Sequence, residues 1–395
     1  MTHPAPYCGD PAMVLGLLAG GDPSGGVLSL FAGRRVSHSF NTRVAIRKAV
    51  DILGLKPGDE VLAPAYNCGS ELDPLRHAGL AIRLYPVSRS AEIDPDRLLR
   101  MVGARTRAIY LTHYFGFLQP ETATVRALCD SHGLHLIEDC ALSLLSGDAP
   151  AEGRAGDISV FCFYKFFPVL AGGAMIVNND RLAAGEAFAR PAPAKAVGKR
   201  LLRAGLGKAL GPAGAARLLG RVRAGTAETA SPDAPMLARP DMPGHYYFDP
   251  SLIDARISNF TLRALSGLAV PGTIAARRQN YLRLLEALSG VAGLEPLRPD
   301  LPATAVPLSL PARVTGGQRN ALVASLKAEG IAATPWWSGY NRHLDFSDSA
   351  EADLSAARNL KDSVLSLPIH QYLGTVEIDH IAARVRDLAR QHVRA

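Results

Sequence analysis

Two residues have types and surroundings suited to chemistry, and the first is Lys165. It is the only charged residue in the apolar segment 159–177, which reads SVFCFYKFFPVLAGGAMIV. A buried ammonium is costly unless it has a specific partner or task. One such task is to form a Schiff base, because desolvation lowers the pKa of a lysine and supplies the neutral amine that attacks an aldehyde. The alternative is a lysine at a strand end whose stem carries the ammonium to water.

The second residue is Asp139, which follows an apolar strand predicted over residues 134–137. A carboxylate at that position needs a cationic or hydrogen-bonding partner. A protonated pyridine nitrogen is one such partner, and a cofactor that combines this ring with an aldehyde needs both an acid and a lysine. The 26 positions from Asp139 to Lys165 leave room for a loop and one further strand. Strand-end aspartates also bind metals or structural arginines, so the pair by itself leaves the chemistry open.

The composition is that of a globular protein. The chain has 395 residues, of which 48% are hydrophobic and 20% charged, enough for two domains with large cores. The net charge of +7 fits anionic substrates, nucleic acid or a membrane surface. Five cysteines without a CxxC pair indicate neither a disulfide framework nor a zinc site, which fits a reducing cytoplasm. We expect no metal site, no signal peptide and no membrane-spanning run.

Strands and helices alternate over the first half of the chain. Helical spacing begins near Thr42, with Asn41 or Thr42 as the N-cap, and stops at Gly54. Further helices are predicted over residues 93–102 and 122–132, and strands over 60–63, 81–87, 107–116 and 134–141. This alternation indicates βαβ units and a parallel sheet, in which ligands bind beyond the carboxyl ends of the strands. That rim is predicted to carry Tyr66, Asn67, His113, Tyr114, Glu138, Asp139 and Lys165.

The chain is predicted to divide into an arm and two domains. The arm covers residues 1–30, the large domain 31–255 and the small C-terminal domain 256–395. The small domain is expected to contain a long helix within residues 256–288, a strand near 305–310, and helices over 317–330 and from Val376 onward. The fold class is therefore α/β.

A basic helical insertion is predicted at about residues 190–245 of the large domain. Residues 195–223 contain eight lysines and arginines and no acid, with leucines between them. Two interpretations stay open: a solvated helical insertion, and a basic amphipathic element that touches an anionic membrane surface through residues 195–223. Nucleic acid is not expected as a partner, because the segment lacks the aromatic residues that would stack on bases.

Several motifs occur in the order and spacing of one family. AIRKAVDILGLKPGDEVLAPAYN, RAIYLTHYFG, LIEDCA and GDISVFCFYKFFPVLAGGAMIVNND carry most of the likeness, and ISNFTL and VLSLPIH add to it. Together they resemble the DegT/DnrJ/EryC1/StrS family of sugar aminotransferases, which depend on pyridoxal 5′-phosphate (PLP, and PMP in its aminated form). The resemblance implies the fold-type-I, aspartate-aminotransferase-like architecture, with a large and mostly parallel seven-stranded sheet domain and a smaller α/β domain.

Carried over by position, the resemblance implies roles for individual residues. Lys165 is implied to hold PLP as a Schiff base and to shuttle protons, and Asp139 to pair with the ring nitrogen. The start of the helix near Thr42 is where the family binds the cofactor phosphate, and helix N-termini bind phosphate through their free amides and dipole. The phosphate-binding residues are implied to be Thr42, Arg43 and Val44, with a charge-assisted contact from the arginine.

Further positions have implied cofactor contacts. Asn259 matches a residue that reaches the cofactor of the neighbouring subunit, which implies a homodimer with shared active sites. Leu142 stands where the family often has Gln or His, and Cys68 where an aromatic residue stacks on the ring. Cys162 and Ser159 are the two candidates for the family's phosphate-binding serine. Tyr66 and Asn67 complete the implied set.

The substrate contacts are less defined. His113 is interpreted either as a structural residue that closes its strand or as a substrate ligand. Trp336, Trp337 and His343 lie where the small domain of the family faces the active site, so they either form a substrate wall or pack in the core. Two acids, Glu71 and Asp73, could be catalytic, but they are interpreted as exposed loop acids, which usually have no catalytic role.

The sequence therefore favours a PLP-dependent aminotransferase. It would move an amino group from a small-molecule donor, glutamate or glutamine by family habit, to a keto-sugar or related carbonyl acceptor in polysaccharide or secondary-metabolite biosynthesis. The departures at Leu142 and Cys68 motivate an alternative, a lyase, dehydratase or C–C bond-forming enzyme of the same fold. Family dehydratases replace the lysine with histidine, so Lys165 favours transamination. The basic insertion motivates a third interpretation, a non-catalytic, membrane-associated protein on this scaffold.

Overall fold

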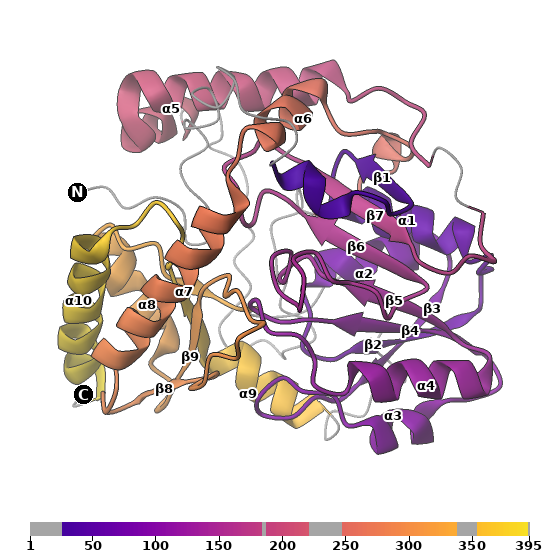
Figure 1. The fold of residues 1–395 in the computed structure, drawn as a ribbon. Helices are drawn as coiled ribbons and strands as arrows, with labels where there is room; N and C mark the ends of the chain where they lie inside the picture. The colour runs from indigo at the N-terminus through magenta and orange to yellow at the C-terminus, as the bar shows by residue number, and fades with distance from the viewer. Residues whose placement is uncertain (1–25, 184–186, 221–246, 338–353, 394–395) are drawn as a thin grey trace.

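The computed structural model describes residues 26–183, 187–220, 247–337 and 354–393 (Figure 1). Most of the predicted N-terminal arm, the loop beyond residue 220 and His343 lie outside the described residues. Two sheets organise the described chain, one in each predicted domain. In this described part, no helix has the length and apolar character needed to span a membrane.

A seven-stranded sheet forms the centre of the large domain (Figure 1). Its strands are β1 (Val36–Ser39), β2 (Glu60–Pro64), β3 (Ala81–Tyr85), β4 (Thr106–Thr112), β5 (His135–Asp139), β6 (Ile158–Cys162) and β7 (Gly173–Val177). The order is β1-β7-β6-β5-β4-β2-β3, and β7 alone runs antiparallel to its two neighbours. All residues of β2, β6 and β7 are buried, as expected for a sheet covered on both faces. The predicted, mostly parallel sheet is confirmed, and β1 is a strand that the sequence did not predict.

Four helices connect these strands. They are α1 (Thr42–Ile52), α2 (Gly69–His77), α3 (Pro95–Met101) and α4 (Thr122–His132). α1 begins where the sequence predicts, because the Asn41 side chain accepts a hydrogen bond of 3.1 Å from the Val44 amide. α4 ends at Gly133, whose φ of 64° lies in the left-handed region that glycine favours.

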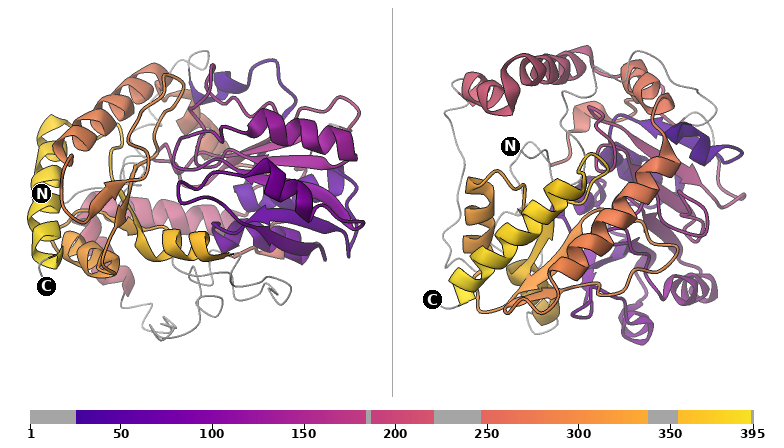
Figure 2. Two further views of the ribbon diagram at one scale, coloured as in Figure 1. Left: turned by 90° about the horizontal axis from the view of Figure 1, so that it is seen from below. Right: turned by 60° about the vertical axis from the view of Figure 1, so that its left-hand side comes forward.

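The basic segment that follows the sheet is helical. Helix α5 (Ala194–Gly220) lies along the outer edge of the molecule, outside both sheets (Figures 1 and 2). Arg200 places its guanidinium over the ring of Phe40, 5.1 Å from the ring centre. Leu202 and Leu210 are 61% and 52% exposed. The described part of this helix is therefore a surface element with apolar side chains facing outward.

A four-stranded antiparallel sheet forms the small domain. Its strands are β8 (Leu294–Pro296), β9 (Leu310–Val314), β10 (Thr334–Pro335) and β11 (Val364–Leu367), in the order β10-β11-β9-β8. Its helices are α7 (Val270–Ala287), α8 (Arg319–Ala328), α9 (Ser355–Ser363) and α10 (Thr375–Val393). α10 packs against both α7 and α8, as the right-hand view of Figure 2 shows for α7. The predicted smaller α/β unit is thus present.

Two predictions for this half were wrong in detail. The long helix expected within residues 256–288 is two helices, α6 (Asn259–Ser266) and α7, because α6 ends at Gly267 and Pro271 lies in the first turn of α7. The strand expected near residues 305–310 begins only at Leu310. Before it, Pro307 has no amide to give to a strand, and the Leu308 amide bonds to the Phe115 carbonyl at 2.8 Å.

Arg277 joins the small domain to the segment that carries Lys165. This arginine on α7 is fully buried, and it donates hydrogen bonds to the carbonyl oxygens of Pro307, Leu308 and Phe166 at 3.3, 2.9 and 3.2 Å. Gln371 donates to the same Phe166 oxygen at 2.8 Å. The residue after Lys165 is therefore held by two side chains of the small domain.

We expect Arg277→Ala to lower the free energy of unfolding by about 3 kcal/mol, because it leaves several buried carbonyl groups without a donor. Chemical denaturation followed by tryptophan fluorescence measures this loss. Gln279→Ala is the matched control, since Gln279 is exposed on the same helix and should change stability by less than about 0.5 kcal/mol. Equal losses for the two variants would contradict the assignment.

Candidate active site

Asp139 ends strand β5 as a buried carboxylate. It is 2% exposed, and its Oδ2 accepts a hydrogen bond of 2.5 Å from the Tyr110 hydroxyl on β4. Its Oδ1 accepts a bond of 2.7 Å from the Ala141 amide. Within the described residues no cationic side chain forms an ion pair with it. These two hydrogen bonds fix the Asp139 carboxylate in position, and a cation could pair with it there.

Lys165 lies on the short loop between β6 and β7, partly buried. Burial lowers the pKa of Lys165, but the thiols and carboxylates around it outweigh burial and hold this pKa above its ordinary value. These groups are Cys162, Asp139, Cys68 and Glu71. The expectation that desolvation would leave Lys165 with a lowered pKa is therefore wrong, because its surroundings are acidic rather than apolar alone.

The start of helix α1 lies beside this loop. A Cβ at Gly173 on β7 would come within 3.0 Å of the Thr42 amide nitrogen, so only glycine allows this close approach. Thr42 donates a 3.1 Å hydrogen bond to the Phe161 carbonyl, and its hydroxyl also contacts the thiol of the buried Cys162. Arg43 is half-buried and bonds to no described residue. The amides of Thr42 and Arg43 and the Arg43 guanidinium are available to an anion, whereas the predicted contact from the Val44 amide is taken by the Asn41 side chain.

Tyr66 and Asn67 lie between β2 and α2, where the large domain contacts the small one. The Tyr66 hydroxyl donates to the Trp336 carbonyl at 2.6 Å, and the Asn67 carbonyl accepts from the fully buried Lys361 at 2.7 Å. The Trp337 ring packs 5.1 Å from that of Tyr66, and both tryptophans are buried. This arrangement supports the core-packing interpretation of Trp336 and Trp337.

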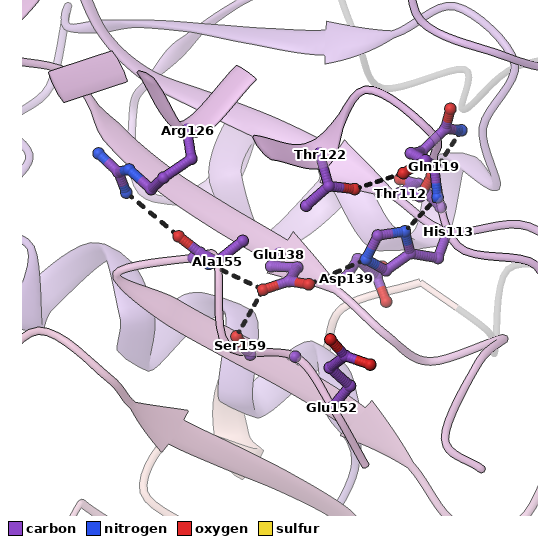
Figure 3. Close-up of polar contacts among 12 residues, drawn as sticks. Thr112, His113, Gln119, Thr122, Arg126, Glu138, Asp139, Glu152, Ala155 and Ser159 are labelled. Atoms are coloured by element: carbon purple, nitrogen blue, oxygen red, sulfur yellow. Dashed lines mark hydrogen bonds and ion pairs between the residues drawn. The ribbon is translucent and has the colours of Figure 1, made fainter. Parts of the chain in front are cut away.

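His113 lies within a hydrogen-bond network (Figure 3). Its Nδ1 accepts from the Gln119 amide and its Nε2 donates to Glu138, both at 2.9 Å, and it is 1% exposed. Burial raises the pKa of Glu138, but the hydrogen bond from His113 outweighs burial and the net shift is downward. The Cys140 sulfur lies within 4.8 Å of a ring nitrogen of His113 and of a carboxylate oxygen of Glu138. The His113 and Glu138 side chains are, however, already hydrogen-bonded to each other. The network supports a structural role for His113.

The remaining predicted residues divide between core and surface. Leu142 is 2% exposed and belongs to the core, and Cys68 is a nearly buried N-cap of α2. Asn259 is exposed at the start of α6 and lines a cavity of about 540 Å³ with Arg34 and Arg256. Neither Lys165 nor Asp139 lines that cavity. Within one chain, Asn259 therefore belongs to a different surface from the lysine and the aspartate.

Two acids were misplaced by the sequence interpretation. Glu71 and Asp73 are not exposed loop residues but belong to α2 and are 9% and 7% exposed. Asp73 accepts a 2.7 Å hydrogen bond from the Phe248 amide. A charged Glu71 would raise the pKa of Lys165, so this carboxyl belongs to the surroundings of the lysine. The spacing Cys68-x-x-Glu71 matches a capping box only at its acidic third position, because the N-cap is a cysteine and not a serine or threonine, so the sequence signal for a helical first turn was weak.

The residues brought together fit PLP. Asp139 is a buried carboxylate that forms no ion pair with the described side chains, and Lys165 supplies an amine. The start of α1 offers amides, and the Arg43 guanidinium, which no described residue binds, is open to a phosphate. The close approach that Gly173 permits leaves the helix start next to the lysine loop. A ring nitrogen, an aldehyde and a phosphate would each meet a chemically matched group.

The sheet order and this arrangement define the class, an α/β protein of the fold-type-I aminotransferase type. The sequence model of the DegT/DnrJ/EryC1/StrS aminotransferase family matches residues 34–201 and 261–386. The chain belongs to this family.

Named relatives and solved structures agree with this assignment. GDP-perosamine synthase of Vibrio cholerae is 30% identical over 152 residues, which cover 37% of this chain and 41% of that protein. The dTDP-3-amino-3,4,6-trideoxy-α-D-glucose transaminase of Streptomyces venezuelae is 29% identical over 35% of this chain and 38% of its own length. These alignments span about two fifths of the curated relatives. The aminotransferase TlmJ of Streptoalloteichus hindustanus has the same fold, with a TM-score of 0.68 and 20% identity over 100% of both chains.

Proposed function

We propose that this protein is a PLP-dependent aminotransferase that moves an amino group from an amino-acid donor to a keto-sugar or related carbonyl acceptor. The observation that carries the proposal is the placement of the buried Asp139 at the end of β5 and of Lys165 on the loop that follows the paired strand β6 and starts beside α1. The relatives named as a perosamine synthase and an amino-sugar transaminase support a sugar as the acceptor.

Each part of the cofactor has a group that would hold it. Asp139 would accept a hydrogen bond from the ring nitrogen while Tyr110 and the Ala141 amide fix its orientation. The amides of Thr42 and Arg43 and the Arg43 guanidinium would bind the phosphate. These contacts leave Lys165 as the amine for the aldehyde.

PLP, when bound, supplies an aldehyde that captures amines and a ring that withdraws electron density. The raised pKa of Lys165 means that Nζ must lose a proton before it becomes nucleophilic. The same nitrogen would then take a proton from the α-carbon of the donor as a general base, and deliver it as a general acid to the former aldehyde carbon of the cofactor. Asp139 would hold the ring nitrogen in place throughout.

The proposal includes a homodimer with shared active sites and a reducing cytoplasmic compartment. Asn259 is exposed on a surface that its own Lys165 does not line, as a residue that serves a partner subunit would be. The four described cysteines, Cys68, Cys129, Cys140 and Cys162, are all free thiols, which supports a reducing compartment.

Lys165→Ala should abolish covalent capture of PLP, because it removes the amine proposed to bind the aldehyde. We expect the wild type incubated with PLP to develop a visible absorption band and, after borohydride reduction, to carry the cofactor mass on the peptide that contains Lys165. Lys327→Ala, which alters an exposed lysine on α8, should label like the wild type. Identical spectra for the wild type and Lys165→Ala would rule out the assignment.

The type of reaction is tested by a single half-reaction. Glutamate or glutamine added to the PLP-loaded protein should convert PLP to PMP and release the corresponding 2-oxo acid in equal amount. Loss of the visible absorption band and enzymatic assay of the 2-oxo acid measure the two products. The departures at Cys68 and Leu142 favour a lyase, dehydratase or C–C bond-forming enzyme as the alternative, and the absence of a half-reaction with any amino donor would select it.

A second role, contact with an anionic membrane surface, has support from the described part of α5. Its basic residues include Lys195 and Lys199, the helix contains no acid, and Leu202 and Leu210 are 61% and 52% exposed. Leucines with cations on one surface helix suit the boundary between lipid headgroups and acyl chains. This contact would place the enzyme at a membrane. If the protein carries out no transamination, the same contact would make it a non-catalytic, membrane-associated protein with the aminotransferase fold.

Replacing both exposed leucines by serine should weaken vesicle binding at least about tenfold, because each leucine would bury apolar surface in the lipid. Sedimentation with vesicles that contain phosphatidylserine measures this binding. Leu282→Ser is the control, since Leu282 is 49% exposed on a different helix, α7. Recovery of the wild type in the supernatant, with or without anionic vesicles, would remove the membrane role.

A further inference from the structure

Glu71 has a buried carboxyl oxygen without a partner. It lies in the first turn of α2 and is 9% exposed. The amide of Cys68, the N-cap of this helix, acts as a hydrogen-bond donor to the carboxyl, as in a capping box. Its Oε1 is buried and has no hydrogen-bond partner among the residues that the structure describes. A neutral glutamine would cap the helix equally well, so capping accounts for one oxygen and leaves the other without a structural role.

Glu71 shares its surroundings with the two groups proposed to hold the cofactor. The titratable groups that interact with it are Asp139 after β5, Lys165 after β6, Lys361 on α9, Tyr85 on β3, and Tyr110 and Tyr114 on and after β4. Burial raises the pKa of Glu71 well above its ordinary value, and the charge of Asp139 raises it further. Lys165 and Lys361 offset this rise only in part.

The contacts of the two carboxyl groups differ. Both oxygens of Asp139 accept short hydrogen bonds, from the Tyr110 hydroxyl at 2.5 Å and the Ala141 amide at 2.7 Å. Glu71 has the Cys68 amide on one side and an unpartnered oxygen on the other. Two carboxyl groups in one buried site do not both ionise at low cost, and the better hydrogen-bonded group keeps the negative charge. Of the two carboxyl groups, Glu71 therefore has the contacts that favour a protonated form.

We propose that Glu71 is a positioning residue that stays protonated beside Asp139 and presents an O–H donor to the cofactor pocket. Asp139 then carries the single negative charge that pairs with a ring nitrogen, an assignment that rests on the proposed function. A second carboxylate in the same pocket would instead compete with Asp139 for the ring and hold Lys165 as an ammonium.

The first test needs no cofactor and measures unfolding by urea across pH. Consider a carboxyl whose pKa is raised in the folded state. Its full contribution to stability is present below its pKa in the unfolded chain, about 4.3, and is lost as the pH rises through its pKa in the folded protein. The side-chain amide of the Glu71→Gln variant cannot ionise. The unfolding equilibrium constant of the wild type, relative to that variant, should therefore rise by up to about tenfold per pH unit from about pH 5 upward.

Two outcomes of this first test are decisive. A ratio that rises with pH supports a protonated Glu71. A ratio that is constant between about pH 5 and about pH 8 overturns the proposal, because it means that Glu71 ionises in the folded protein as it does in the unfolded chain. This result is independent of whether PLP binds.

The second test asks whether the O–H donor serves the pocket. The dissociation constant of PLP should stay within about threefold of the wild type in Glu71→Gln, which keeps a donor, and rise roughly 10- to 100-fold in Glu71→Leu. Asp73→Asn is the control, because it changes another buried acid of the same helix that binds the Phe248 amide. It should leave the dissociation constant unchanged.

The outcomes separate this inference from the proposed function. Equal weakening by Glu71→Gln and Glu71→Leu overturns the inference, because the pocket would then need an ionised Glu71. Equal affinity in all variants also overturns it, because capping alone would be the role of the residue. A wild type that binds no PLP refutes the proposed function and the positioning role together, while the pH series still decides where the proton resides.

Discussion

The buried charge of Asp139 constrains much of the large domain. A carboxylate that is 2% exposed needs fixed hydrogen-bond donors, and it takes them from the Tyr110 hydroxyl and the Ala141 amide. Tyr110 can donate only because β4 and β5 are parallel neighbours in a register that pairs Thr112 with Asp139. The parallel pairing of β5 with β6 then brings the lysine loop to the same edge of the sheet. The site thus depends on strand order as much as on the identity of its residues.

The small domain completes this site through backbone contacts. Arg277 and Gln371 both donate to the carbonyl of Phe166, the residue that follows Lys165. Lys361 donates a hydrogen bond to the Asn67 carbonyl. The Tyr66 hydroxyl donates one to the Trp336 carbonyl. Because main-chain oxygens accept all these bonds, the positions of the rim and of the lysine loop are fixed by the neighbouring domain. The domains therefore act as one unit around Lys165.

The sequence predicted the elements whose signals are local. Asn41 as a cap of α1 and Gly133 as the end of α4 were predicted because caps depend on a few adjacent residues. The pKa direction of Lys165 and the burial of Glu71 were predicted wrongly because both depend on groups that are distant in the chain and meet only in the fold. Lys361 and Arg277 were not predicted to matter, since nothing near them in the sequence shows that they are buried against the other domain.

The departures of this chain from its family pattern are connected through the structure. Leu142 and Cys68 provide neither a polar group nor an aromatic face where family members have them, and both are largely buried. The polar group that contacts Asp139 from β4 is the Tyr110 hydroxyl, and Glu71, three residues after Cys68 in the first turn of α2, lies in the electrostatic surroundings of Asp139. Neither hydrogen bond to Asp139 comes from position 68 or 142, because the donors are Tyr110 and the Ala141 amide. An apolar or thiol side chain at those two positions therefore leaves the donors that fix Asp139 in place.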